Sequence, residues 1–158
     1  MRYKFIVDAN VGKLVKWLRI MGFDAIFAGD LDDDEIAEIA INEGRILLTR
    51  DTSFLRRKSV FSGELKVVYI IHDDVREQLR QVVRALDLLP QSRPFSLCIC
   101  CNEELLPCAK EEVRELVPPY VYSTQENFMR CPRCGRIYWR GTHWHRMKEV
   151  ISSLAQNE

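Results

Sequence analysis

The chain is 158 residues long, 47% hydrophobic and 29% charged, with 23 basic and 23 acidic side chains. That length is enough to bury a real core, in one ordinary domain or in two small ones. No stretch approaches the roughly 18 consecutive apolar residues that a membrane span needs, and no apolar signal segment is present, so we expect a soluble cytoplasmic protein with no membrane partner.

The first segments predict a strand followed by an amphipathic helix. Residues 3–7 are largely apolar and read as a strand. In residues 11–21 apolar side chains such as Leu18 recur on one face, whereas basic side chains, Arg19 among them, face water. Gly22 ends this helix at the position just beyond the C-cap, where glycine is favoured.

Strand and helix patterns continue to alternate up to residue 90. They comprise a strand at 23–28, a helix at 34–43 closed by Gly44, strands at 45–49 and 66–71, and a helix at 75–88. This order predicts an α/β fold with a mostly parallel sheet, right-handed crossovers and helices on both faces. In such a fold, ligands bind beyond the carboxyl ends of the strands.

Aspartates follow the predicted strand ends. They are Asp8, Asp30, Asp32, Asp33, Asp34, Asp51, Asp73 and Asp74. A converging group of carboxylates requires a cation, and hard oxygen ligands suit Mg²⁺ or Mn²⁺. Metal-assisted hydrolysis of phosphate esters is the natural chemistry, because the metal lowers the pKa of a bound water and neutralises charge on the phosphate.

Helix capping is the competing explanation for some of these acids. Asp32 with Glu35, and Asp74 with Glu77, fit the spacing of a capping box. Asp8 and Asp51 follow apolar strands directly, and the sequence offers no cap to account for them. We therefore regard these two as the stronger candidates for a functional site. A solvated surface remains the alternative for the acidic run at 24–43 as a whole.

Two Cys-x-x-Cys pairs predict a closed zinc site. The four cysteines Cys98, Cys101, Cys131 and Cys134 have the spacing of a structural zinc ribbon, with one Zn²⁺ per chain. Cys100 and Cys108 are expected to be ordinary thiols, although Cys100 could replace Cys101 as a ligand. Two disulfides are the competing explanation, which the expected reducing compartment disfavours. A linker at 89–94 precedes the cysteines, so we divide the chain into an α/β domain at 1–91 and a zinc ribbon with a C-terminal helix at 92–158.

Several segments together resemble one known family. They are Asp8, the helix from Gly12 to Asp24, Asp33-Asp-Glu-Ile36, Arg45-Ile-Leu-Leu-Thr-Arg-Asp51, Asp73-Asp74 with Gln78-Leu79, Cys98-x-x-Cys-Asn102, and Cys131-x-x-Cys-Gly-x-Ile-Tyr-Trp139 with Gly141-Thr-His-Trp144. Over nearly its whole length the chain is similar to the Mut-seven C-terminal ribonuclease-like family, which belongs to the PIN-like nucleases. The chain departs from that pattern at Asn10-Val11 and at Leu97.

The resemblance implies a PIN-like fold with a zinc ribbon and metal-dependent RNA cleavage. The family pattern assigns the catalytic site to Asp8, Asp33 and Asp51, with Asp74 as a weaker fourth member. Two alternatives from other classes stay open. A phosphoacceptor receiver also places an acid after its third strand, but it normally needs paired acids after the first strand and a late lysine. A non-catalytic adaptor that binds nucleic acid or protein is the stronger rival.

The basic segment at 127–148 is the candidate surface for RNA. It carries six arginines and lysines and no acid. Arginines interleaved with aromatic rings suit single-stranded RNA, because guanidinium groups pair with phosphates and rings stack on unpaired bases. The predicted contacts are Arg140, Arg146, Trp139 and Trp144. The local alternative is that the arginines neutralise a thiolate-bound metal and the rings form the small core of the ribbon.

Overall fold

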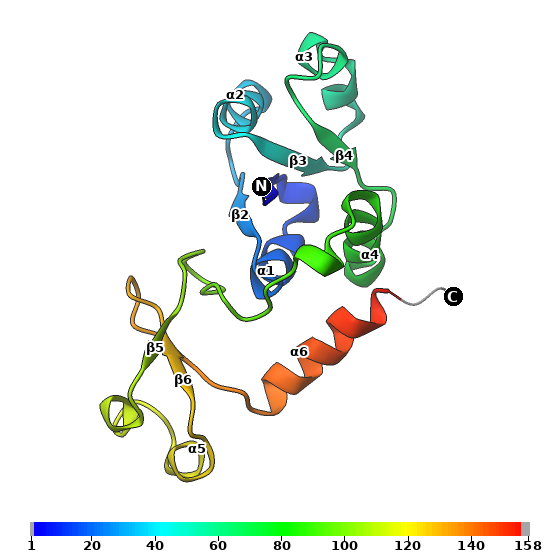
Figure 1. Ribbon diagram of the computed structural model, residues 1–158. Helices are drawn as coiled ribbons and strands as arrows, with labels where there is room; N and C mark the ends of the chain where they lie inside the picture. The colour runs from blue at the N-terminus through cyan, green and yellow to red at the C-terminus, as the bar shows by residue number, and fades with distance from the viewer. Residues whose placement is uncertain (1, 156–158) are drawn as a thin grey trace.

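The computed structural model describes residues 2–155 and contains the predicted parallel sheet. Its strands are β1 (Lys4–Val7), β2 (Asp24–Phe27), β3 (Arg45–Thr49) and β4 (Val67–Tyr69). They lie side by side in the order β2-β1-β3-β4, and every neighbouring pair is parallel (Figure 1). The fold class predicted from the sequence is therefore confirmed.

The register aligns the carboxyl ends of the central strands. Val7, the last residue of β1, pairs with Phe27 on β2 and with Leu48 on β3. Every residue of β3 is buried, as expected for a strand of a parallel sheet that is covered on both faces. The chain segments that follow β1, β2 and β3 consequently emerge at one edge of the sheet.

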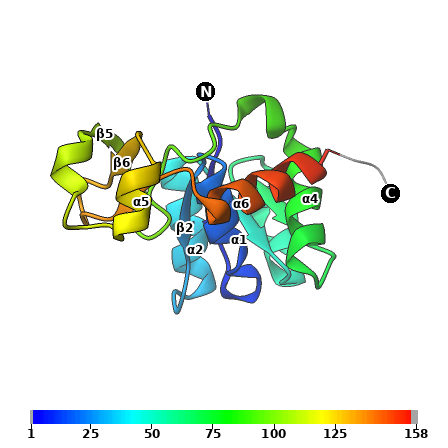
Figure 2. The same cartoon turned by 90° about the horizontal axis from the view of Figure 1, so that it is seen from below.

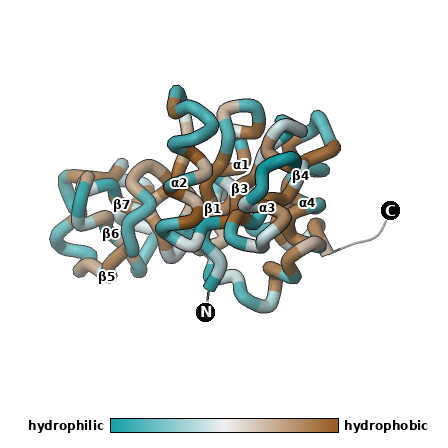
Figure 3. The backbone as a smooth tube through the Cα atoms, turned by 90° about the horizontal axis from the view of Figure 1, so that it is seen from above, coloured by the Kyte–Doolittle hydropathy of each residue, from teal (hydrophilic) through white to brown (hydrophobic). Residues whose placement is uncertain are grey.

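Helices cover both faces of the sheet, as predicted. Helices α1 (Leu14–Ile20) and α4 (Val75–Leu86) bury their apolar side chains on one face. Helix α2 (Asp33–Glu43) covers the other, where Ile36 and Ala40 pack with Leu47 of β3. The backbone coloured by hydropathy shows apolar segments through the middle of the α/β unit, around the labelled β1 (Figure 3).

The element boundaries differ from the predictions where turns intervene. The first helix was expected from residue 11, but residues 9–11 form the 3₁₀ turn η1 (Ala9–Val11) and α1 begins at Leu14. The helix predicted at 75–88 stops two residues early, at Leu86, because Asp87 adopts a left-handed conformation. After β3 the chain forms η2 (Thr52–Arg56) and the short helix α3 (Lys58–Phe61).

A smaller antiparallel unit follows the linker. It contains β5 (Leu106–Cys108), η4 (Lys110–Val113), α5 (Pro119–Thr124), β6 (Phe128–Arg130) and β7 (Ile137–Tyr138). Its three strands lie in the order β5-β6-β7. It has two small apolar clusters. One surrounds the buried Cys98 and Cys131, and the other is built from Val113, Val117 and Phe128.

The C-terminal helix α6 (Thr142–Ser153) leaves this unit and packs back on the first one. Met147 and Ile151 of α6, with Leu154 just beyond it, belong to the same core as the apolar residues of α1 and α4. Figure 2 shows α6 lying across α1 and reaching α4. The division of the chain near residue 92 stays a prediction, but the apolar face of α6 is buried by the α/β unit.

The linker is held against the end of α1 rather than free. It begins with η3 (Leu89–Gln91), and then the backbone N–H of Arg93 donates to the carbonyl of Met21 at 2.8 Å. Gly22 has a φ of 89°, and a Cβ at this position would lie 2.3 Å from the carbonyl oxygen of Arg93. A glycine is therefore required both by the left-handed backbone and by the close approach of the linker.

Candidate functional site

Asp8 and Asp51 lie at the carboxyl edge of the sheet on neighbouring strands. Asp8 comes directly after β1, and Asp51 comes two residues after the end of β3. From β1 the chain continues to β2 on one side and then to β3 on the other, which makes the junction of β1 and β3 a topological switch point. The structure thus brings together the two acids that the sequence singled out.

Thr49 joins the two aspartates. Its hydroxyl donates to Oδ2 of Asp8 at 2.6 Å and accepts from the backbone N–H of Asp51 at 3.0 Å. The side chain is fully buried at the end of β3, so the hydroxyl has one orientation that satisfies both partners. Thr49 therefore fixes the Asp8 carboxylate relative to the backbone that carries Asp51.

Asp33, the first residue of α2, lies close enough to this edge for the charges of Asp8 and Asp51 to affect its pKa. Burial raises its pKa, and the negative charges of Asp51 and Asp8 raise it further. Hydrogen bonds from Ser53 instead lower the pKa of Asp51. The three acids therefore occupy one region of negative potential, and proton or cation binding there is favoured.

The expectation that no cap accounts for Asp8 and Asp51 was wrong. Asp8 caps η1, because its Oδ1 accepts from the N–H of Ala9 at 2.9 Å. Asp51 caps η2 by accepting from the N–H of Ser53 at 2.9 Å. Short 3₁₀ turns have no apolar periodicity that a sequence pattern could reveal, which is why these caps were missed. The caps also hold the two carboxylates in place.

Most of the other acids of this edge have structural partners. Asp74 caps α4 by accepting from the N–H of Glu77 at 3.1 Å, and Asp32 forms the predicted capping box with Glu35. Two others pair with arginines, Asp73 with Arg50 and Asp34 with Arg57. At the opposite end of the strands, Asp24 pairs with the buried Arg45. The capping explanation thus applies to Asp74, whose side chain is exposed at the start of α4.

Two further residues at this edge were given no role by the sequence. The Asn10 side-chain oxygen accepts from the N–H of Arg50 at 3.2 Å, which ties the turn after β1 to the loop after β3. Phe27 ends β2 with 52% of its surface exposed, and its ring lies against Gly12, where a Cβ would come within 2.9 Å of it. An exposed aromatic ring beside carboxylates offers a stacking surface.

The four predicted cysteines converge. Among residues 2–155, they form the one group of three or more potential metal-ligand side chains that could hold an ion, with all four sulfurs within 4.8 Å of one another. The Sγ atoms of Cys98 and Cys134 lie 3.7 Å apart. The edge of a tetrahedron with Zn–S bonds of about 2.3 Å is about 3.8 Å, so the spacing fits a tetrathiolate site. None of the described cysteines forms a disulfide.

Hydrogen bonds around Cys98 favour its thiolate form. The Tyr138 hydroxyl lies 3.2 Å from Cys98 Sγ and accepts from the N–H of Ile99 at 3.2 Å, so its own proton points to the sulfur. Burial raises the pKa of Cys98, but hydrogen bonds from Tyr138 and from backbone N–H groups outweigh it and bring the pKa to about 7. A thiolate stabilised before metal arrives is a suitable ligand.

Two side chains dock this cysteine loop on the start of β2. Arg19 was expected to face water. Instead, its Nε donates to the carbonyl of Ala25 at 2.9 Å and its Nη1 to the carbonyl of Ile99 at 2.8 Å. The amide of Asn102 accepts from the N–H of Ala25 at 3.1 Å and donates to Asp24 at 2.6 Å. These bonds satisfy backbone groups at the free edge of the sheet and attach the ribbon at the end opposite the Asp8 and Asp51 edge.

The predicted RNA-contacting residues are divided between packing and exposure. Trp139 packs on Phe128 with ring centroids 6.4 Å apart. Trp144 lies 4.9 Å from Phe95, and the guanidinium of Arg140 lies 5.2 Å from its ring centroid. Arg146 is exposed on α6. Trp139 therefore contributes to the small core of the ribbon, as the local alternative expects. Arg140 and Trp144 instead form a partly exposed pair.

The comparisons with known proteins give one result. No curated protein and no solved structure matches the chain. No helix within residues 2–155 is long and apolar enough to cross a membrane. A family model described as the Mut7-C RNAse domain matches residues 3–151, and with that match over nearly its whole length the chain belongs to the Mut7-C RNAse domain family.

Proposed function

We propose that the chain is a ribonuclease that hydrolyses RNA phosphodiester bonds at the edge formed by Asp8, Asp33 and Asp51, with Mg²⁺ or Mn²⁺ as its catalytic ion. The observation that supports this most directly is the Thr49 hydroxyl, which bonds Asp8 and the backbone of Asp51 at once. The two bonds keep the Asp8 carboxylate in one orientation beside the backbone that carries Asp51, as a preorganised site requires.

The residues fit a hard divalent cation by charge and donor type. Carboxylate oxygens are the ligands that Mg²⁺ and Mn²⁺ prefer. Burial is the main cause of the raised pKa of Asp33, and the negative charges of Asp51 and Asp8 add to it. When bound, the ion would lower the pKa of a water molecule and neutralise charge on the phosphate. Asp8 and Asp51 would hold it through carboxylates that their caps keep oriented. Among residues 2–155 only the cysteines already lie at mutual metal-ligand spacing, so Asp33 would complete the site from α2 by a side-chain rotation when the ion binds. For Asp74 we propose a capping role.

We further propose that the cysteine tetrad holds one structural Zn²⁺ and that the substrate is single-stranded RNA. The tetrad has four soft sulfur donors at tetrahedral spacing and a Tyr138 hydroxyl supporting one of them. Its attachment to β2 through Arg19 and Asn102 would make the bound ion stabilise the sheet edge as well as the ribbon.

The experiment is RNA cleavage with and without Mn²⁺ by wild type, Asp8→Asn and Asp51→Asn. We expect each variant to lose at least about two orders of magnitude in rate, as expected when a metal-oriented reaction loses a ligand. Asp87→Asn is the matched control. It removes a carboxylate at the far end of α4, in a left-handed position that asparagine tolerates.

A mixed pool of single-stranded and duplex RNA tests the substrate at the same time, and mapping the cut ends defines the reaction. Wild-type rates in Asp8→Asn and Asp51→Asn would contradict the proposal. The protein would then be a binding adaptor whose carboxylates only cap their turns.

A further inference from the structure

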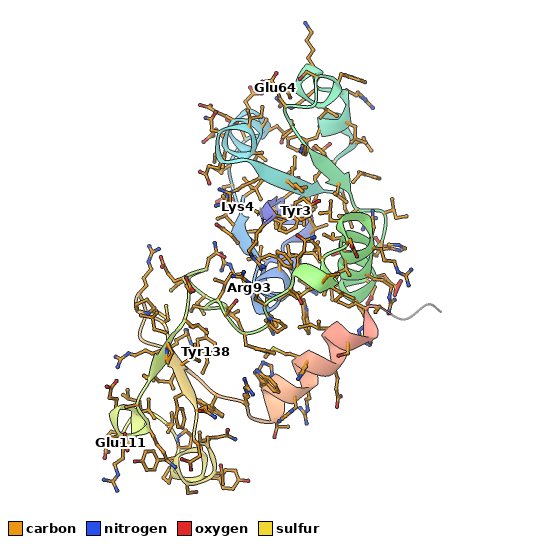
Figure 4. All side chains as sticks on the ribbon, in the orientation of Figure 1. Tyr3, Lys4, Glu64, Arg93, Glu111 and Tyr138 are labelled. Carbon is orange, nitrogen blue, oxygen red and sulfur yellow. The ribbon has the colours of Figure 1, made fainter. Side chains whose placement is uncertain are left out.

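A cavity of about 400 Å³ lies between the ribbon, the linker and the start of α6. Its walls include Phe95 of the linker, Met129 of β6, Ile137 of β7, and the rings of Trp139 and Trp144. The sheet of the ribbon presents one side to this space through Tyr138, which Figure 4 labels. Its size is that of a small-molecule site, and apolar aromatic walls are typical of such sites.

The aromatic walls are held in position by their own contacts. Phe95 lies 4.9 Å from Trp144 between ring centroids, and Phe95 is anchored because its N–H donates to the carbonyl of Ile20 at 2.8 Å. A Cβ at Gly141 would lie 2.9 Å from Nε1 of Trp139, so the glycine leaves room for that ring. The cavity is thus formed before any ligand binds, which removes part of the ordering cost.

The charge at the mouth selects for an anion. Arg140 lines the cavity, with its guanidinium 5.2 Å from the Trp144 ring centroid, and Lys148 places its ammonium 5.0 Å from the same ring. The segment at 127–148, which supplies most of the wall, carries no acid. A flat ring with an attached anionic group complements apolar aromatic walls and a cationic mouth.

We propose that this cavity binds one unpaired nucleotide of an RNA strand, with the base between the aromatic walls and the phosphate at Arg140. The choice of RNA rests on the proposed function. Base stacking on aromatic rings and phosphate pairing with arginine are the two interactions by which unpaired nucleotides are held.

The position of the cavity makes it a holding site rather than a site of chemistry. Ile20 at the end of α1 lines it, and the adjoining cysteine loop contacts Asp24 and Ala25 where β2 begins. The carboxylates lie beyond the other end of the strands. Four residues of β2 span about 13 Å, so a short RNA strand would reach from one to the other.

Intrinsic fluorescence reports occupancy directly. The chain has three tryptophans, of which Trp139 and Trp144 line the cavity and Trp17 belongs to α1. In a Trp17→Phe, Asp8→Asn background without Mg²⁺ or Mn²⁺, no cleavage interferes. We expect saturable quenching by adenosine, adenosine 5′-monophosphate and a short single-stranded oligoadenylate, with the oligonucleotide binding most tightly.

Two variants and one control separate the parts of the site. Arg140→Ala should weaken binding of the monophosphate and the oligonucleotide by about tenfold, because a charge-assisted hydrogen bond is lost, and leave adenosine unchanged. Thr142→Tyr places a ring in the cavity from an exposed position and should abolish quenching by all three. Arg76→Ala removes an exposed arginine of α4 outside the lining and should leave binding of the monophosphate unchanged.

Absence of saturable quenching, or quenching that persists in Thr142→Tyr, would overturn the proposal. So would a monophosphate that binds as tightly as the oligonucleotide, because the occupant would then be a free nucleotide. The two proposals fail separately: full nuclease activity in Asp8→Asn refutes the catalytic site, whereas the quenching experiment does not depend on catalysis.

Discussion

Replacing Thr49 with valine tests how the acidic edge is built. Valine keeps the buried volume but removes the hydroxyl that donates to Asp8 Oδ2 at 2.6 Å and accepts from the Asp51 N–H at 3.0 Å. A hydrogen bond to a charged group contributes about 1.5–3 kcal/mol and one between neutral groups about 0.5–1.5 kcal/mol. Asp8 is only half-buried, so water replaces part of the first bond, and we expect a loss near the lower sum, about 2 kcal/mol.

Urea unfolding followed by circular dichroism measures this loss, and thermal melting should fall by about 4–8 °C. Thr49→Ser is the matched control. It keeps the hydroxyl and loses one buried methyl group, which costs about 1 kcal/mol. In the cleavage assay Thr49→Ser should retain most activity and Thr49→Val should lose it. A valine variant as stable as wild type, or more active than the serine variant, would refute the orienting role of the hydroxyl.

Three further predictions concern a charge, a ligand and a turn. The raised pKa of Asp33 means that its protonated form stabilises the fold below the ordinary value of 3.8, and that this contribution is lost as the pH rises through the folded-state pKa. Asp33→Asn should remove this pH dependence in urea titrations, and Mg²⁺ should stabilise wild type more than the variant. Cys131→Ser should lose most zinc by elemental analysis, whereas Cys108→Ser keeps it, and equal zinc in both would refute the assigned ligands. Gly22→Ala should lower the free energy of unfolding by at least about 2 kcal/mol, because the added Cβ would clash with the carbonyl oxygen of Arg93 and the left-handed backbone would be strained. Gly44→Ala, with no atom within 4 Å of the added Cβ, should lose about 1 kcal/mol.

Much of the fold was predictable because its strands, helices and turns follow from local sequence patterns. The strand at Arg45–Thr49 was predicted with its observed bounds, and the turns at Gly22 and Gly44 have the expected left-handed backbone. These features depend on periodicity and on the conformational freedom of glycine, which are properties of a few consecutive residues. The convergence of the four cysteines was predictable for a related reason, since each Cys-x-x-Cys pair forms its own tight turn.

The candidate site was predictable in its members and not in its connections. Asp8 and Asp51 stood out because they follow apolar strands, and parallel strands end at one edge. The role of Thr49 was hidden, because a threonine at the end of a buried strand is also an ordinary strand residue. Only pairing β1 with β3 places its hydroxyl beside Asp8, which is 41 residues away in the sequence.

The sequence by itself determined the alternation of strands and helices, the cysteine spacing and the identity of the strand-end acids, because each depends only on residues that are close together along the chain. Tertiary structure alone decided the partners of the long polar side chains. Arg19 looked like a solvated helix residue, yet it bonds a carbonyl 80 residues away and attaches the ribbon. It likewise decided that α6 buries its apolar face on the α/β unit and so closes an aromatic cavity. Such contacts form only once distant surfaces meet, and helical or strand periodicity does not specify which surface a face will meet.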